Sequence, residues 1–188
     1  MAANGIRVVC YSQRTLPSAY IDDIGGLHAF IRNCHNQVGR EYIEIAMAKA
    51  HYIVLALKPA SHIKHLPQTR SRSNKSVVAG FAFMEHNVQN TERENSGLYI
   101  SLICSNNRTG KMILRKVEEK AKAMRLSFVN LNSLELATEF YYKNDFKYVH
   151  FGDNPCNMTH KKVRKDSVKK KDEGSYTWDM AKCILAKP

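Results

Sequence analysis

The sequence lacks any apolar run that approaches the length of a membrane-spanning helix, and its N-terminus lacks the charged-then-apolar pattern of a secretory signal. It also lacks a C-x-x-C pair. Cys156 and His160 lie four residues apart, but no second ligand pair accompanies them, so no metal site is expected. We therefore expect an intracellular protein, cytoplasmic or nuclear, with reduced thiols packed mostly as small hydrophobic side chains. The five cysteines are Cys10, Cys34, Cys104, Cys156 and Cys183.

Acidic residues are scarce relative to basic ones. The chain has 29 Lys and Arg against 17 Asp and Glu, which gives a net charge of +12. Such a charge suits a polyanionic cosubstrate, a nucleic acid or an acidic protein surface, and it is a poor match to a pocket for a polycationic small molecule. The richness in Asn and Lys fits an AT-rich genome, such as that of a large DNA virus or a protist. At 188 residues the chain is long enough for one well-packed domain and short for two.

Residues 97–149 carry the most specific pattern. A strand ending in a glycine-containing turn and a helix start is a place to hold phosphate, because free N–H groups point out of the turn and the helix dipole favours an anion. Gly110 lets the backbone approach a ligand, and Arg108 and Lys111 add positive charge. The pattern predicts a strand at 97–105, a helix at 112–125, a strand at 127–133, a helix at 135–146 and a strand at 147–151.

This block resembles the acetyl-CoA-binding core of the GNAT superfamily of acyl-CoA-dependent N-acyltransferases. Its helix ending, 140–146, reads FYYKNDF and is similar to the family's Phe/Leu-Tyr-x-x-x-Gly-Phe, with Ala137 where the family usually has a small residue. The resemblance covers residues 76–149 well and both ends loosely. Two departures stand out. The family loop Arg/Gln-x-x-Gly-x-Gly/Ala matches residues 105–110, of which only Gly110 survives, and Asp145 replaces a glycine, although Asp tolerates a left-handed conformation better than most residues.

The resemblance implies a single α/β domain over residues 1–188. Its sheet would be mixed and mostly antiparallel, with helices on both faces and a splayed central parallel pair formed by 98–105 and 127–132. The last strand, 176–185, would pair beside 146–151, and the basic run at about 159–175 would be a loop insertion. Further strands are predicted at 6–11, 51–59 and 76–86, helical segments in 15–38, and either a helix or a strand lead-in at 40–50; Gly80 marks a bulge or close approach.

The resemblance implies that Tyr141 protonates the departing thiolate. The other interpretation is that Tyr141 and Tyr142 are helix aromatics that fill core and rim. Glu85 is a weak candidate for the general base and His86 a weaker one, since such a residue is more often a solvated strand-end residue. Positions along 98–105 where many relatives carry an acidic residue hold Tyr99 and Ser101 here.

Contacts to acetyl-CoA are expected along the strand, the loop and the helix start. Ile103 and Cys104 also suit plain core packing. Asn132 also suits a helix cap, because Glu135 follows it at capping-box spacing. The expected cofactor-binding residues are Ile103, Cys104, Ser105, Arg108, Thr109, Gly110, Lys111, Met112 and Asn132.

These features predict an N-acetyltransferase that transfers the acetyl group of acetyl-CoA to a primary amine of a protein or small molecule. The alternative is a GNAT-fold protein without turnover that serves as a basic binding or structural component. The run 159–173 has three interpretations: a solvated loop, a contact to nucleic acid or an acidic protein, or a nuclear targeting signal. Because the run lacks interleaved aromatic residues, stacking on single-stranded bases is not suggested.

Overall fold

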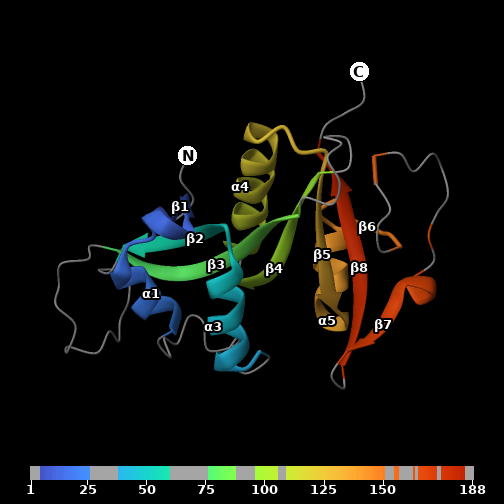
Figure 1. Ribbon diagram of the computed structural model, residues 1–188, viewed down its shortest axis with the longest axis horizontal. Coiled ribbons are helices and arrows are strands. Elements are labelled where there is room, and N and C mark those ends of the chain that lie inside the picture. The colour runs from blue at the N-terminus through green and yellow to red at the C-terminus, as the bar shows by residue number, and fades with distance from the viewer. Residues whose placement is uncertain are drawn as a thin grey trace. The chain divides into compact units, whose positions relative to one another are not determined.

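The computed structural model describes residues 5–25, 38–59, 76–87, 96–105, 109–150, 155–156, 163, 165–172 and 175–184. Its strands form a mixed sheet in the order β1-β2-β3-β4-β5-β8-β6, with β7 paired to β8 (Figure 1). The chain divides into two compact units, Met1–Met84 with Leu102–Lys116 and Glu85–Ser101 with Val117–Pro188.

The first unit contains an antiparallel strand trio and the helices that cover it. β1 pairs antiparallel with β2, and β2 pairs antiparallel with β3. The ambiguous segment 40–50 is a helix, with Ile43 and Ala46 on its buried side. The unit holds β1 (Arg7–Ser12), η2 (Gln13–Thr15), α1 (Ser18–Gly25), α3 (Arg40–Lys49), β2 (Tyr52–Pro59), most of β3 (Ser76–Asn87), the end of β4 (Gly97–Ser105) and the start of α4 (Thr109–Ala123).

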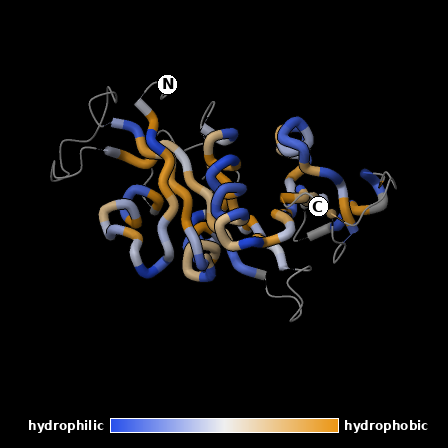
Figure 2. The backbone as a smooth tube through the Cα atoms, turned by 90° about the horizontal axis from the view of Figure 1, so that it is seen from above, coloured by the Kyte–Doolittle hydropathy of each residue, from blue (hydrophilic) through white to orange (hydrophobic). Residues whose placement is uncertain are grey.

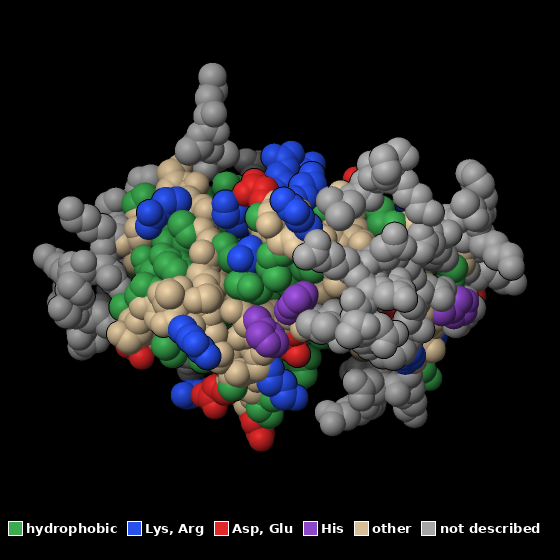
Figure 3. All heavy atoms as spheres, turned by 45° about the horizontal axis from the view of Figure 1, so that its top comes forward, with side chains coloured by type: hydrophobic (Ala, Val, Ile, Leu, Met, Phe, Trp, Pro, Cys, Tyr) green, Lys and Arg blue, Asp and Glu red, His purple; other side chains and the backbone are tan. Residues whose placement is uncertain are grey.

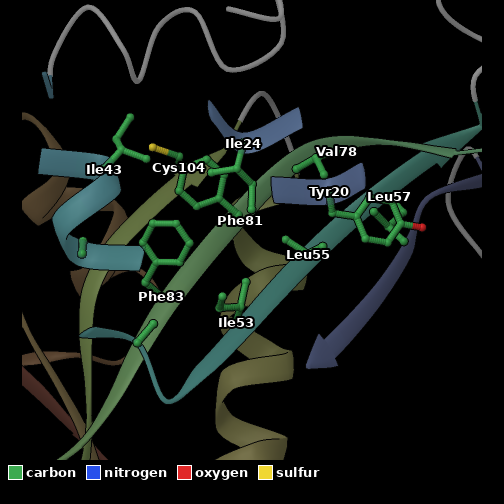
Figure 4. Packing of buried hydrophobic residues seen from close by; sticks show 12 residues of the cluster. Tyr20, Ile24, Ile43, Ile53, Leu55, Leu57, Val78, Phe81, Phe83 and Cys104 are labelled. Atoms are coloured by element: carbon green, nitrogen blue, oxygen red, sulfur yellow. The ribbon is translucent and has the colours of Figure 1, made fainter. Parts of the chain in front are cut away.

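The core of this unit lies between α1, α3 and one face of β2 and β3. Alternate residues of a strand point to the same face, so Ile53, Leu55 and Leu57 of β2 enter the core together. Phe81 and Phe83 of β3 stack with ring centroids 4.8 Å apart, and Figure 4 shows them facing the helices. In Figure 2 the strands are mostly hydrophobic along their length, while the helices alternate between hydrophobic and hydrophilic residues. This is the pattern of helices that cover a sheet.

Gly80 of β3 marks a close approach on the opposite sheet face. A Cβ built there would lie 3.0 Å from the carbonyl oxygen of Cys104 and 3.1 Å from Cδ1 of Ile113 on α4. The β2–β3 register also shifts next to this position, between Ala56 and Leu57. The predicted close approach and irregularity at Gly80 are both confirmed. Since Gly80 and Phe81 are adjacent in a strand, α4 covers the face opposite to α1 and α3.

The second unit is built on β5 and β8. β4 pairs parallel with β5 from Gly97–Phe128 to Ile100–Leu131, and β4 then runs on to Ser105 and β5 to Leu134. β8 pairs antiparallel with β5 along one edge and with β6 and β7 along the other. The predicted fold class and the position of the last strand are confirmed. The unit adds β5 (Phe128–Leu134), α5 (Glu135–Tyr142), β6 (Lys147–Tyr148), η5 (Lys165–Val168), β7 (Lys169–Asp172) and β8 (Ser175–Cys183).

Both α4 and α5 end in the same hydrogen-bonded motif. After α4, Leu126 N donates to the Ala121 carbonyl and Arg125 N to that of Lys122, at 3.0 and 2.9 Å. After α5, the corresponding donors are the amides of Phe146 and Asp145. This is the Schellman pattern, which needs one left-handed residue, and Arg125 and Asp145 have φ of 57° and 69°. The predicted left-handed conformation of Asp145 is confirmed.

Two sequence predictions are wrong for the described residues. The basic run is not simply a loop, because its part Lys165–Asp172 forms η5 and β7, and β7 pairs with β8. Strand pairing lets consecutive lysines stay ordered, which composition alone did not reveal. The cysteines are not all free thiols. Cys156 and Cys183 form a disulfide with a Cα–Cα distance of 5.0 Å, and Cys104 is also disulfide-bonded.

The disulfide joins residues 27 positions apart, brought together only when β8 returns along β5, so the scattered spacing of the cysteines gave no sign of it. Among the described cysteines, Cys10 takes part in no disulfide. None of the described helices has both the length and the apolar character needed to cross a membrane.

Candidate active site

The end of β4 and the start of α4 hold most of the expected cofactor residues. Ser105 is exposed at the end of β4, and Ile103 is half-buried. α4 begins at Thr109, which is buried together with Gly110, and Lys111 is exposed. The first turn of α4 contains no acidic residue, so no carboxylate of this turn competes for its free N–H groups. This helix start therefore suits a phosphate group. Arg108 lies outside the described residues.

Gly80 explains how the end of β4 is placed beside α4. Besides Cys104 O and Ile113, a Cβ at position 80 would lie 3.2 Å from Cα of Ser105. Two of these three neighbours are backbone atoms, which cannot rotate away as a side chain does. A glycine here lets β3, the end of β4 and the first turns of α4 pack directly on one another. The backbone of the predicted cofactor residues Cys104 and Ser105 therefore packs closely against the backbone of β3 at Gly80.

The Cys104 side chain is buried in the core of the first unit. It is 2 % exposed, belongs to the core under α1 and α3, and its sulfur is in a disulfide (Figure 4). The alternative interpretation of Cys104 as a core residue is confirmed. Any contact of this residue to a cosubstrate would come from its backbone, which is how an extended ligand adds to a strand.

Tyr141 lies in the second unit and is a core residue. It is 5 % exposed, with its ring 5.2 Å from that of Phe140 and 5.6 Å from that of Phe146, both edge-on. Burial raises the pKa of the Tyr141 hydroxyl above its ordinary value. The hydroxyl therefore stays protonated at neutral pH, which suits a proton donor and not a base. Tyr142 is 47 % exposed, so the two tyrosines do fill core and rim.

The remaining candidates lie in the same unit. Glu85 and His86 are half-buried near the end of β3. Asn132 is exposed on β5, and its expected role as a helix cap is wrong, because the strand continues to Leu134 and Leu134 is the N-cap of α5 without a side-chain cap bond. A residue within a strand has no helix start to cap. Its role as a cofactor ligand stays a prediction.

Three ion pairs that involve residues of β7 and β8 were not predicted. Lys182 of β8 contacts Glu118 of α4 at 2.9 Å and Asp145 at 3.5 Å. Lys170 of β7 contacts the buried Asp179 of β8 at 2.5 Å. Asp179 is 4 % exposed, and a buried carboxylate needs a partner. Lys182 and Glu118 are 64 positions apart, so no local pattern signals their pair. Lys170 and Asp179 are brought together by the β7–β8 hairpin, which was not predicted.

Comparison with known proteins supports the fold. No family model matches the sequence, and no curated protein matches it. Solved structures do match. An acetyltransferase of the GNAT family from Staphylococcus aureus has a TM-score of 0.56 at 13% identity, covering 96% of this chain and 99% of that chain.

Two others are similar. Tetrahymena GCN5 has a TM-score of 0.52 at 12% identity, covering 91% of this chain and 90% of that chain. An aminoglycoside 6'-acetyltransferase type Ii has a TM-score of 0.52 at 15% identity, covering 97% and 99%. The resemblance drawn from the helix ending and the Gly110 turn is confirmed at the level of the fold. The chain has the fold of the GNAT acetyltransferases.

Proposed function

We propose that the protein is an N-acetyltransferase that transfers an acetyl group from acetyl-CoA to a primary amine. The observation that carries the proposal is the start of α4, where a helix of 15 residues begins with Thr109 and Gly110, has an exposed lysine at 111 and has no acidic residue in its first turn. In the GNAT fold this is the position of the pyrophosphate loop. Free N–H groups and a nearby cation are the donors that a pyrophosphate needs.

Coenzyme A would be held by backbone groups and one lysine. The N–H groups at Thr109, Gly110, Lys111 and Met112 would bind the phosphates, and the absence of a side chain at Gly110 leaves the backbone open to them. The backbone at Ile103 and Ser105 would bind the extended arm. The thioester of acetyl-CoA supplies the activated acetyl group.

Tyr141 and Glu85 have complementary roles in the proposal. Tyr141 is protonated because of its burial, so its hydroxyl would give a proton to the departing thiolate. Glu85 is only half-buried at the end of β3 and would accept a proton from the amine, directly or through water. General acid and base groups of this kind each contribute roughly 10²–10⁴-fold to rate.

The acceptor is a protein or small-molecule amine. A net charge of +12 disfavours polycationic acceptors, because a like charge repels the amine before its proton is removed. The acceptor amine therefore belongs to a neutral or acidic molecule.

Calorimetric titration with acetyl-CoA tests the proposal. Wild type would bind at micromolar Kd, and Lys111→Glu would bind more weakly because it places a negative charge beside the phosphates. Lys111 is exposed, and an acidic residue in the first turn of a helix favours folding, so this variant keeps its fold. Gly110→Trp would abolish binding by filling the turn. Ala123→Trp, at an exposed position near the other end of α4, is the matched control and would bind like wild type.

No binding by wild type would contradict the enzyme proposal and would leave a GNAT-fold protein without turnover. Equal loss in Ala123→Trp would show that the effect comes from disturbing α4 and not from the turn. A melting curve for each variant separates loss of the site from loss of the fold.

A further inference from the structure

Lys169 of β7 lies beside aromatic residues of β8. The antiparallel register places Lys169 opposite Trp178, and Tyr176 lies two positions away on β8. Residues opposite each other in an antiparallel pair project from the same sheet face. The run 159–173 contains no aromatic residue in sequence, but the hairpin supplies them from the partner strand. Stacking was not expected from the sequence of this run, and the aromatic residues beside β7 come from β8.

The lysine ammonium groups sit directly over the rings. Lys169 Nζ lies 3.8 Å from the centroid of Tyr176 and 5.7 Å from that of Trp178, and Lys165 Nζ lies 4.9 Å from Trp178. Distances under about 6 Å are typical of cation–π contacts. An ammonium held in this way keeps N–H donors on its far side, so its position is fixed while it can still bind a phosphate.

A second group of the same kind lies along the same edge of β8. β5 occupies one edge of β8 from Thr177 to Cys183, so β6 and β7 must both lie on the other edge. There Tyr148 pairs with Met180, its ring lies 6.2 Å from that of Tyr142, and Lys147 Nζ lies 5.0 Å from the Tyr142 ring. Lys147, Tyr142, Tyr148, Lys169 and Tyr176 make up what we call the lysine–tyrosine strip.

The strip is open to solvent and carries net positive charge. Tyr142 and Tyr176 are each 47 % exposed. Lys165 and Lys170 have carboxylate partners in Glu135 and Asp179, at 3.7 and 2.5 Å. Within the described residues no carboxylate pairs with Lys147 or Lys169. Among the residues that the structure describes, no carboxylate therefore neutralises the charge of these two lysines.

Net charge alone would not single out this surface. On the face shown in Figure 3, Lys and Arg side chains lie at separate places and acidic side chains lie among them. What distinguishes the strip is the repeated combination of a lysine and an exposed tyrosine. The β8 residues Tyr176 to Met180, which these groups flank, span about 13 Å.

We propose that the lysine–tyrosine strip binds single-stranded nucleic acid. The lysines would contact phosphates, and a base would stack on Tyr176, which is 47 % exposed, through the ring face opposite the Lys169 ammonium group. An acidic peptide would pair with the lysines, but its carboxylates would not stack on an aromatic ring. The exposed tyrosine therefore favours nucleic acid as the ligand. The proposal does not depend on acetyl transfer.

Titration of the full chain with a labelled oligothymidylate tests the proposal. Fluorescence anisotropy gives Kd, and the emission of Trp178, the single tryptophan of the chain, reports contact at the strip because Lys165 and Lys169 lie over its ring. Tyr176→Ala would weaken binding roughly five- to 100-fold, as expected for loss of one stacked base. Lys169→Gln would reduce the slope of log K against log salt by about 0.7, as expected for one lost phosphate contact.

Lys49→Gln is the matched control, since it removes one charge from an exposed lysine at the end of α3. Binding by Lys49→Gln at the wild-type level, with the losses above, would support the strip. An equal loss in Lys49→Gln would overturn it, because the affinity would then follow net charge alone. Unchanged affinity in Tyr176→Ala, or equally tight binding of polyglutamate, would also overturn it and would indicate an acidic protein partner. Melting curves confirm that each variant is folded.

Discussion

The carbonyl oxygen of Tyr141 accepts a hydrogen bond from the Phe146 amide at 3.1 Å, while the two rings meet edge-on at 5.6 Å. The bond closes the Schellman motif that ends α5, and the ring contact is buried beside it. Because the two aromatic residues are five positions apart, the backbone hydrogen bond and the buried ring contact form between the same two residues. This ending is a folding motif whether or not the Tyr141 hydroxyl takes part in catalysis, so only kinetics can assign its chemical role.

Tyr141→Phe is expected to lower kcat by at least about 100-fold and to leave the KM for acetyl-CoA unchanged. The hydroxyl would act on the departing thiolate and not on cosubstrate binding, and one general acid contributes roughly 10²–10⁴-fold. The measurement is steady-state kinetics with an accepted amine. A variant with wild-type kcat would remove Tyr141 from the mechanism, and Tyr142→Phe, at a half-exposed position, serves as the control.

Tyr141 also predicts a loss of stability at alkaline pH. Burial raises the pKa of its hydroxyl in the folded state, so the folded state keeps a proton that the unfolded state releases above about pH 10. The free energy of unfolding should therefore fall as pH rises above 10, by at most about 1.4 kcal/mol per pH unit. Urea titrations at pH 8 to 11 measure it. In Tyr141→Phe this part of the decline should disappear; an unchanged decline would mean that other groups cause it.

Arg125→Gly is expected to stabilise the protein by about 0.5–1 kcal/mol. Arg125 is exposed and has φ of 57°, a conformation that costs a side-chain-bearing residue energy and glycine very little. Lys122→Gly, at an exposed position inside α4, should instead destabilise by about 1 kcal/mol. Chemical denaturation of both variants gives the comparison. If both changes destabilise equally, the left-handed residue at 125 would not be the determinant.

Gly97→Ala is expected to destabilise the start of β4 by about 1–3 kcal/mol. A Cβ there would lie 2.2 Å from Cε2 of Phe128, its neighbour in the parallel β4–β5 register, so the ring must move. Phe128→Ala removes that ring. In a double-mutant cycle the cost of Gly97→Ala should largely vanish in the Phe128→Ala background. Additive effects would show that the glycine is needed for another reason.

Breaking the Cys156–Cys183 disulfide is expected to lower the free energy of unfolding by about 3 kcal/mol, since the bond closes a sizeable loop in the unfolded chain. The comparison is wild type, with and without reductant, against Cys156→Ser/Cys183→Ser. Reductant should destabilise the wild type by more than the double variant, because the disulfide of Cys104 is reduced in both proteins and the Cys156–Cys183 bond is lost only in the wild type. Mass spectrometry of alkylated protein checks that the bond is present; two free thiols at these positions in non-reduced protein would contradict the structure.

The sequence predicted the local elements well and the long-range pairings poorly. β4 at Gly97–Ser105 matches its predicted bounds, and the close approach at Gly80 and the left-handed Asp145 were both anticipated, because each depends on neighbours in the chain or on one residue's own conformational limits. The Cys156–Cys183 bond and the lysine–tyrosine contacts were not. These depend on where β8 returns, which no local periodicity encodes.

The same disulfide changes the connectivity of the chain. Residues from Cys156 to Cys183 form a covalent ring that contains η5, β7 and nearly all of β8. Cleavage of any peptide bond within this ring leaves both fragments in one molecule, so a nicked protein would keep its mass, apart from one added water, until it is reduced. The basic segment offers many sites for trypsin-like proteases, and it lies within this ring. A single cut there releases no fragment while the disulfide is intact.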